Sequence, residues 1–425
     1  GQGSADQVLT SDGTDISWED ASGGATDING LSDAKTFGTA SIMLGDATTG
    51  TINAANYNVG LGIDVFAALT TGDNNVAVGY SALAANTTGT GNHAFGYQSL
   101  NAVVTNSYNT AVGFQSMLLN TGEHNTAMGS IALNRNTSGI NNAAFGSRAL
   151  YANTTANSNT AVGFHALTAN TTGAGNTALG AHALDANTTA SNSTGIGYGA
   201  LSTATAGANN TALGSEAMAA TTTGAYNVGL GNDAMVALTT GTECVGIGQS
   251  VLQGLTTGGN NIGLGTGAGN ASNPGGNVQT GSNQICIGNA SHTNAHVQID
   301  WTIASDKRDK TDVTPLDMGL GFINKLEPVT YKWDKRGKYK EGTTPDGTHK
   351  EAWLDVGFLA QDVEELEAEF GHKIDDETNL TTYISEDKNS YGLTYNKFIP
   401  MLVKAVQELS AKVEELETKL NNKEK

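Results

Sequence analysis

The hydrophobic and polar positions between residues 42 and 265 repeat with a period of 17 residues. In each copy a large apolar residue stands directly before a Gly, and the residue before it is almost always Ala or Gly. One step measures 16 residues instead of 17, and a weaker last copy ends at Gly288. A fixed short period is typical of a solenoid or stacked array. The repeat glycines are Gly45, Gly62, Gly79, Gly96, Gly113, Gly129, Gly146, Gly163, Gly180, Gly197, Gly214, Gly231, Gly248 and Gly265.

Further columns of the repeat predict its local structure. Alternation of large and small residues over four or five positions is typical of a β-strand. Asn stands four residues before the Gly in nearly every copy, and a Thr-Thr-Gly turn closes most copies, as at residues 87–89. Gly permits positive φ and Asn bonds its own backbone, so both columns indicate turns. Each copy is therefore predicted to form two short strands and two turns, which make one coil of a β-solenoid.

Coils must stack because a single coil has too few large apolar side chains to form a core. A second large residue, Leu, Met or Phe, stands four positions after the Gly, so each coil offers two large apolar side chains. Two are too few to bury a core alone. We expect the residue before each Gly to point into a shared core. The Ala/Gly column then requires a close neighbour on the other face, and this indicates three chains packed around a common axis.

These columns resemble the head repeats of trimeric autotransporter adhesins, in which an Asn-x-Ala-x-Gly motif builds a trimeric left-handed β-roll. The resemblance implies a fold and not a ligand. It predicts a mainly β chain with a trimeric, left-handed parallel β-roll or solenoid shaft of ~17-residue coils over residues 41–304. Residues 1–40 precede the shaft as an N-terminal linker or fibre segment, and part of this segment resembles a linker motif of phage fibre proteins.

The distribution of charge divides the chain near residue 300. Residues 1–304 carry three basic and 16 acidic residues, whereas the last 121 residues carry 18 basic and 25 acidic ones. Such a shift marks a domain boundary. The net charge of −20 argues against a nucleic acid or an anionic membrane surface as partner. The sequence has no run of 18 apolar residues, so no membrane insertion is predicted.

Cysteine and histidine do not indicate a metal site or a disulfide framework. Cys244 and Cys286 are interpreted as small apolar fillers. His165 and His182 occupy the same column in adjacent coils, and His292 and His296 lie four residues apart. We interpret all four as exposed polar side chains. No metal and no cofactor is therefore predicted.

The chain changes character after Trp301. Four segments follow in order at residues 305–310, 326–333, 356–364 and 391–395, with helix-like and strand-like runs in alternation. Their order resembles the intramolecular chaperone of endosialidase type, a self-cleaving domain at the C-terminus of phage tailspikes and fibres. The resemblance implies a small α+β chaperone domain over residues 305–425.

The end of the chain carries a heptad seam. Apolar residues are spaced 4-3-4-3-4 within a helix predicted over residues 398–422. This spacing, with Glu and Lys around it, favours a coiled coil over a lone amphipathic helix that packs on its own domain. We expect the coiled coil to be trimeric. The seam residues are Leu402, Val406, Leu409, Val413, Leu416 and Leu420.

The resemblance to the chaperone of endosialidase type also implies roles for the residues at the domain boundary. It implies that Ser305 is a nucleophile, that Lys310 is its base, and that the bond between Ala304 and Ser305 is cleaved. A Ser hydroxyl needs a partner to take its proton, and a Lys can do this only where burial lowers its pKa. Asp306 and Arg308 either orient the loop or form an exposed charge cluster. By spacing alone, Ser-Asp would be a turn cap and the Lys a solvated charge.

The predicted function is a structural and host-attachment protein of a phage tail fibre, assembled in the host cytoplasm and located in the virion. Its C-terminal domain would drive homotrimer assembly and then cleave itself in a single-turnover Ser-Lys reaction, with no external substrate. Expected partners are a host cell-surface receptor, either a glycan or an outer-membrane component, and other tail proteins at the N-terminus. The alternatives are a bacterial trimeric surface adhesin, which needs a membrane anchor, and a polysaccharide-degrading tailspike, which needs a carboxylate-lined groove.

Overall fold

The structure is a computed structural model in which two units are distinguished, Gly1–Glu243 and Cys244–Lys425. The residues that the structure describes are 7–11, 16–20, 34–37, 41–45, 54–270, 277–292, 295–296, 298, 303–339, 344–385, 388 and 390–423.

The first unit begins with two antiparallel pairs of strands. Strand β1 (Gln7–Ser11) pairs with β2 (Ile16–Asp20), and β3 (Ala34–Phe37) pairs with β4 (Ser41–Leu44). From β4 onwards the pairing becomes parallel, and each residue lies opposite the residue one repeat later. The first strand of the parallel array, β4, therefore begins at Ser41.

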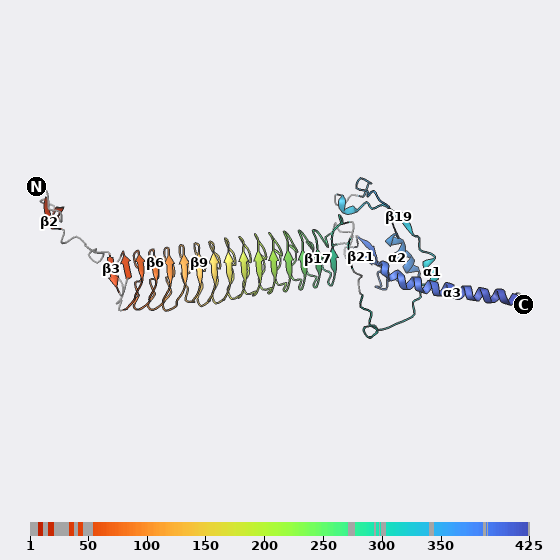
Figure 1. The fold of residues 1–425 in the computed structure, drawn as a ribbon, viewed down its shortest axis with the longest axis horizontal. Coiled ribbons are helices and arrows are strands. Elements are labelled where there is room, and N and C mark those ends of the chain that lie inside the picture. The colour runs from red at the N-terminus through yellow and green to blue at the C-terminus, as the bar shows by residue number, and fades with distance from the viewer. Residues whose placement is uncertain are drawn as a thin grey trace. The chain divides into compact units, whose positions relative to one another are not determined.

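A parallel β-solenoid of about 17 residues per coil fills the rest of the first unit. Figure 1 shows its strands stacked one after another with their turns aligned. The strands are β5 (Val59–Leu61), β6 (Val76–Val78), β7 (His93–Phe95), β8 (Thr110–Val112), β9 (Thr126–Met128), β10 (Ala143–Phe145), β11 (Thr160–Val162), β12 (Thr177–Leu179), β13 (Thr194–Ile196), β14 (Thr211–Leu213) and β15 (Val228–Leu230). Three further strands of the repeat, β16 (Val245–Ile247), β17 (Ile262–Leu264) and β18 (Ile285–Ile287), pair in parallel within the second unit.

The prediction of two strands per coil was wrong, because each complete coil from β5 to β17 has one three-residue strand and otherwise consists of turns. Left-handed backbone explains the difference. In the coil around Gly163, Ser158, His165 and Leu167 have φ of 60°, 58° and 52°. L-residues with such φ values cannot continue a strand. The same three positions are left-handed in most other coils, so the chain turns sharply where a second strand was expected.

The predicted orientation of the apolar columns was also wrong. The middle strand residue, Ala or Gly, points into the coil of its own chain, as does the Leu four places after the repeat Gly. The large residue before the Gly points outward, so that Phe95 is 40% exposed and Leu179 47% exposed. The inward Leu explains why the middle strand residue is small, because a Cβ on Gly195 would lie 3.2 Å from Leu184 Cγ. Packing within one chain, and not a partner chain, therefore requires Ala or Gly in this column.

The repeat Gly is needed where neighbouring coils touch. Gly163 has φ of +136°, which L side chains rarely adopt. A Cβ at this residue would lie 2.5 Å from the carbonyl oxygen of Gly180 in the next coil. Both the backbone conformation and the close approach exclude larger residues, and the same combination recurs at the other repeat glycines from Gly45 to Gly214.

Buried asparagines link each coil to the next. Asn159 Oδ1 accepts a hydrogen bond from the backbone N–H of Asn176 at 2.9 Å, and its Nδ2 donates to the carbonyl of Gly173 at 2.9 Å. We expected Asn to bond its own turn, but its amide bridges two coils instead. The ladder runs through Asn58, Asn75, Asn92, Asn109, Asn125, Asn142, Asn159, Asn176, Ser193, Asn210 and Asn227.

The second unit continues beyond the repeat as a small α+β domain, as predicted. Among the described residues, two antiparallel strand pairs, β19 (Val329–Tyr331) with β20 (Asp355–Gly357) and β21 (Thr382–Ile384) with β22 (Tyr391–Leu393), accompany three helices. The helices are α1 (Leu320–Ile323), α2 (Ala360–Glu369) and α3 (Phe398–Lys423), and short 3₁₀ turns are η3 (Lys307–Asp309), η4 (Arg336–Lys338) and η5 (Tyr395–Lys397). The domain ends in the long helix α3, as predicted. The core contains Met318, Phe322, Val363, Leu366, Phe398 and Met401.

Two carboxylates on helices hold this domain together. Glu367 on α2 is fully buried and accepts hydrogen bonds from the backbone N–H and hydroxyl of Thr381, at 2.6 and 2.7 Å, and from Thr382. Glu408 on α3 accepts from the backbone N–H of Leu320 at 2.8 Å, and this bond lowers the pKa of the Glu408 carboxyl. The first contact fixes β21 to α2, and the second fixes the start of α1 to α3.

Substitution of Asn159 by Ala is expected to destabilise the shaft. It leaves the N–H of Asn176 and the carbonyl of Gly173 without these partners in a buried position, which costs about 1–3 kcal/mol. Thermal melting should occur at a lower temperature, and amide exchange should accelerate around residues 142–176. Asn159→Ser should be destabilised less than Asn159→Ala, because Ser keeps an acceptor for the next coil, as Ser193 does for Asn210 N–H at 3.3 Å. Wild-type melting and exchange in Asn159→Ala would contradict the role of the ladder.

Candidate functional site

The segment that carries Ser305 is exposed throughout residues 303–315. Its local structure is set by Asp306, which stands in extended conformation (φ −67°, ψ 133°) directly before the 3₁₀ turn η3. The Asp306 carboxylate accepts a hydrogen bond from the backbone N–H of Arg308 at 2.9 Å and so caps the turn. At the other end, the N–H of Lys310 bonds to the carbonyl of Lys307 at 3.3 Å. The turn thereby brings residue 310 back towards residue 305.

Asp306 and Arg308 form an ion pair across the same turn. Arg308 Nη2 lies 2.6 Å from Asp306 Oδ2, and Nε lies 3.1 Å from both carboxylate oxygens. The Arg308 side chain, followed by its backbone N–H, lowers the pKa of the Asp306 carboxyl, and the pair raises the pKa of Arg308. The carboxylate binds both the backbone and the guanidinium of Arg308, and both side chains are exposed, so the geometry is compatible with either interpretation offered by the sequence.

The turn places the two residues of the expected dyad in direct contact. Lys310 Nζ lies 2.6 Å from Ser305 Oγ, within hydrogen-bond distance, although five residues separate them. Ala304, whose carbonyl belongs to the expected scissile bond, is exposed beside them. All five residues named from the sequence, Ala304, Ser305, Asp306, Arg308 and Lys310, therefore lie around one turn.

The contact between Ser305 and Lys310 defines what the site can do chemically. As an ammonium, Lys310 donates to the hydroxyl; as a neutral amine, it can accept the hydroxyl proton and activate the oxygen as a nucleophile. Loss of the ammonium proton is favoured by removal from water. Both side chains are exposed in the single chain, so any burial must come from another surface.

Sequence reasoning missed an apolar cavity in the same unit. The cavity has a volume of about 270 Å³ and is open at one side. It draws residues from α1, the segment after α1, the residue that follows β20, and α3, which are far apart in the sequence and gave no local signal. Its lining consists of Ile323, Leu326, Pro328, Phe358, Phe398 and Leu402.

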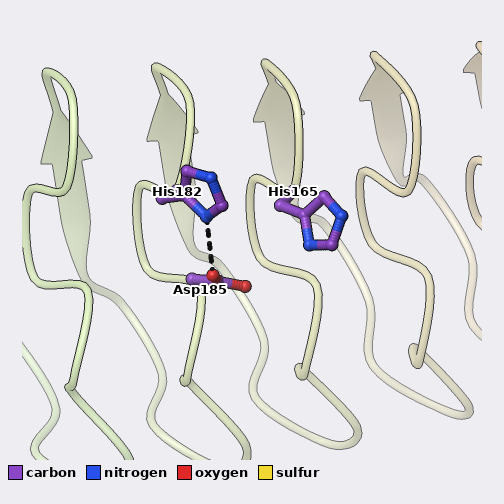
Figure 2. A group of neighbouring side chains, drawn as sticks. All are labelled: His165, His182 and Asp185. Atoms are coloured by element: carbon purple, nitrogen blue, oxygen red, sulfur yellow. Dashed lines mark hydrogen bonds and ion pairs between the residues drawn. The ribbon is translucent and has the colours of Figure 1, made fainter.

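The prediction that all four histidines are exposed was correct for His292 and His296 only. His292 is exposed, with Nδ1 near Asn289 Oδ1 at 3.1 Å, and His296 is exposed as expected. His165 and His182, by contrast, are half-buried and lie beside Asp185, which the sequence did not single out (Figure 2). Asp185 was missed because its proximity to His165 arises from the stacking of coils.

Comparison with known families gives a match for the segment that carries the site. Residues 305–372 match the family model of the chaperone of endosialidase, and the match begins at Ser305. No curated protein and no solved structure matches the chain. A β-solenoid of 17-residue coils followed by a chaperone-of-endosialidase domain fits a phage tail fibre or tailspike.

No helix among the described residues is long and apolar enough to cross a membrane.

The ion pair beside Ser305 predicts a measurable titration. Because Arg308 stabilises the carboxylate, the pKa of Asp306 should lie below the ordinary value of 3.8, and the pair should persist as the pH falls through that value. Only below the lowered pKa does protonation break the pair and release the cap. NMR titration of selectively labelled aspartate carboxyls measures this pKa. Arg308→Gln should raise it, whereas Lys307→Gln on the same turn should leave it unchanged; equal values in all three proteins would contradict the assignment.

Proposed function

We propose that the chain is a structural and host-attachment protein of a phage tail fibre, whose C-terminal domain drives trimer assembly and then cleaves the Ala304–Ser305 bond. The observation that carries this proposal is the 2.6 Å contact between Ser305 Oγ and Lys310 Nζ at the first residues of the chaperone domain. A nucleophile and a base at this boundary can separate the shaft from the chaperone once assembly is complete.

The reaction uses the peptide bond next to the nucleophile. Neutral Lys310 takes the Ser305 hydroxyl proton while Oγ attacks the carbonyl carbon of Ala304. The carbon–nitrogen bond then breaks, the amine of Ser305 receives a proton, and the Ala304 acyl group remains as an ester on Oγ. Water hydrolyses this ester and leaves a carboxylate on Ala304 and the hydroxyl on Ser305. The Asp306–Arg308 pair holds the turn that keeps Oγ and Nζ together.

Trimerisation is supported in the shaft by its outward apolar column. The residue before each repeat Gly alternates with the inward Ala, so these side chains form one continuous row along successive coils. Regular apolar rows of this length are rare on monomers and mark contact surfaces. Those more than one third exposed in the first unit are Leu44, Leu61, Phe95, Met128, Phe145, Leu179 and Leu213.

The C-terminal unit offers two further surfaces for partner chains. All six residues of the heptad seam on α3 are exposed, up to 64% for Leu416. The apolar cavity beside α3 shares Leu402 with this seam. Parallel copies of α3 would cover the seam as a coiled coil and would bring a partner side chain to the cavity.

Assembly and cleavage are coupled in this proposal through the environment of Lys310. Packing of three chaperone domains would remove Ser305 and Lys310 from water, and this favours the neutral amine that the reaction needs. The released shaft would then be kinetically trapped, because the domain that guided its folding is no longer attached. The mature fibre would bind a host surface receptor, and residues 1–40 would join other tail proteins.

Cleavage is expected to depend on both Ser305 and Lys310. Mass spectrometry of the wild type should find fragments that end at Ala304 and begin at Ser305, whereas Ser305→Ala and Lys310→Ala should retain the full 43.5 kDa. The rate should rise with pH, because only the neutral form of Lys310 accepts a proton.

Lys307→Ala is the matched control for cleavage, since Lys307 lies on the same exposed turn, and it should cleave like the wild type. An uncut wild type that is already trimeric, or cleavage at 304/305 in Ser305→Ala, would show that the dyad assignment is wrong.

Trimer formation is expected to depend on the seam of α3. In the uncleavable Ser305→Ala background, light scattering should give three times the chain mass of 43.5 kDa. Leu409→Asp combined with Leu416→Asp places charge in the seam and should reduce this mass to that of the monomer. Lys412→Gln with Glu414→Gln alters the same helix outside the seam and should leave the mass unchanged. A monomeric parent at micromolar concentration would refute the trimer.

A further inference from the structure

The 17-residue coil places two histidines side by side on the shaft. His165 and His182 each stand two residues after a repeat Gly, with nearly identical left-handed φ values of 58° and 59°. Their side chains therefore leave adjacent coils in the same direction, and the ring centroids lie 5.4 Å apart. Figure 2 shows the two imidazoles on neighbouring coils. The same column holds Gln98 and Gln115, whose side chains hydrogen-bond at 2.8 Å, so neighbours in this column do meet.

Asp185 completes the group from the following turn of the second coil. Its Oδ2 lies 2.9 Å from Nδ1 of His182. One ring nitrogen of each His and one carboxylate oxygen of Asp185 all lie within 4.8 Å of one another. All three residues are half-buried, so they are accessible to an ion from solvent while being held in place.

We propose that His165, His182 and Asp185 form a binding site for a divalent transition-metal ion, with Zn²⁺ as the preferred occupant. Two imidazoles and one carboxylate are a ligand set typical of Zn²⁺, with a water molecule as fourth ligand. Ligand atoms of a tetrahedral site lie about 3.4 Å apart when metal–ligand bonds are near 2.1 Å. Small side-chain rotations bring atoms now within 4.8 Å to that separation.

The backbone around the group is fixed before any ion arrives. The N–H of His182 bonds to the carbonyl of Phe164 at 3.0 Å, and that of His165 bonds to Ser147 at 3.1 Å. The ring of Phe164 lies 4.2 Å from that of His165 and 5.5 Å from that of His182, which limits ring rotation. Arg148 precedes His165 in the column, but its guanidinium lies over the Tyr151 ring, 5.8 Å from the centroid. A bound ion would thus clamp two coils whose register the asparagine ladder already sets.

Calorimetric titration of the metal-free full chain with Zn²⁺ tests the site, and titration with Co²⁺ reports its geometry through visible absorption. We expect one saturable ion per chain and the intense absorption of tetrahedral Co²⁺. His165→Gln, His182→Gln and Asp185→Asn should each weaken binding about tenfold or more. These replacements already occur in the same columns, at Gln98, Gln115, Asn101 and Asn134, so the variants should keep the fold.

His93→Gln is the control, because His93 lies on β7 several coils away, and it should bind like the wild type. Circular dichroism and melting without metal confirm that each variant remains folded. The proposal is overturned if no saturable binding occurs, if the three ligand variants bind as tightly as His93→Gln, or if Co²⁺ gives only the weak absorption of an octahedral ion.

Discussion

The rest of the shaft depends on one buried amide per coil. The side chain of Asn159 accepts from the next coil through Oδ1 and donates to a carbonyl fourteen residues ahead through Nδ2. In a narrow interior filled otherwise by Ala and Leu, an unpaired amide would cost more than most apolar contacts contribute. The ladder therefore admits one register between coils. The glycine contacts, the outward apolar row and the pairing of His165 with His182 all require that register.

The sequence was sufficient for those features of the fold that are periodic along the chain. A constant step between glycines identified coils, and a 4-3 seam identified α3 almost to its last residue. Periodicity does not distinguish inside from outside, however, and the Ala column was assigned to a partner chain although Leu184 within the chain explains it. The prediction of a second strand in each coil was wrong because Leu167, a residue type common in strands and helices, adopts a left-handed backbone here. Such a conformation is imposed by neighbouring coils and has no local sequence signal.

The candidate sites differ in the same way. Ser305 and Lys310 are five residues apart, so a short capped turn is enough to join them, and the family motif indicated their roles. What the sequence could not supply was the exposure of both side chains in the single chain. The position of Asp185 beside His165, by contrast, could not be predicted from the sequence. The two residues lie on adjacent coils, and only the observed path of the chain, with its left-handed residues, brings Asp185, His165 and His182 together.

Variation in coil length has a consequence for how such a shaft can evolve. The step from Asn109 to Asn125 is one residue short, yet Asn125 N–H still bonds to Asn109 Oδ1 at 3.0 Å, and β8 and β9 keep their pairing. The step from β17 to β18 is six residues longer, and these strands also pair in register. Coil length can thus change in the turns without loss of the strand pairing or of the ladder bonds. Such turns can gain or lose residues in the course of evolution, and so change the surface of the shaft, while its stacked interior stays unchanged.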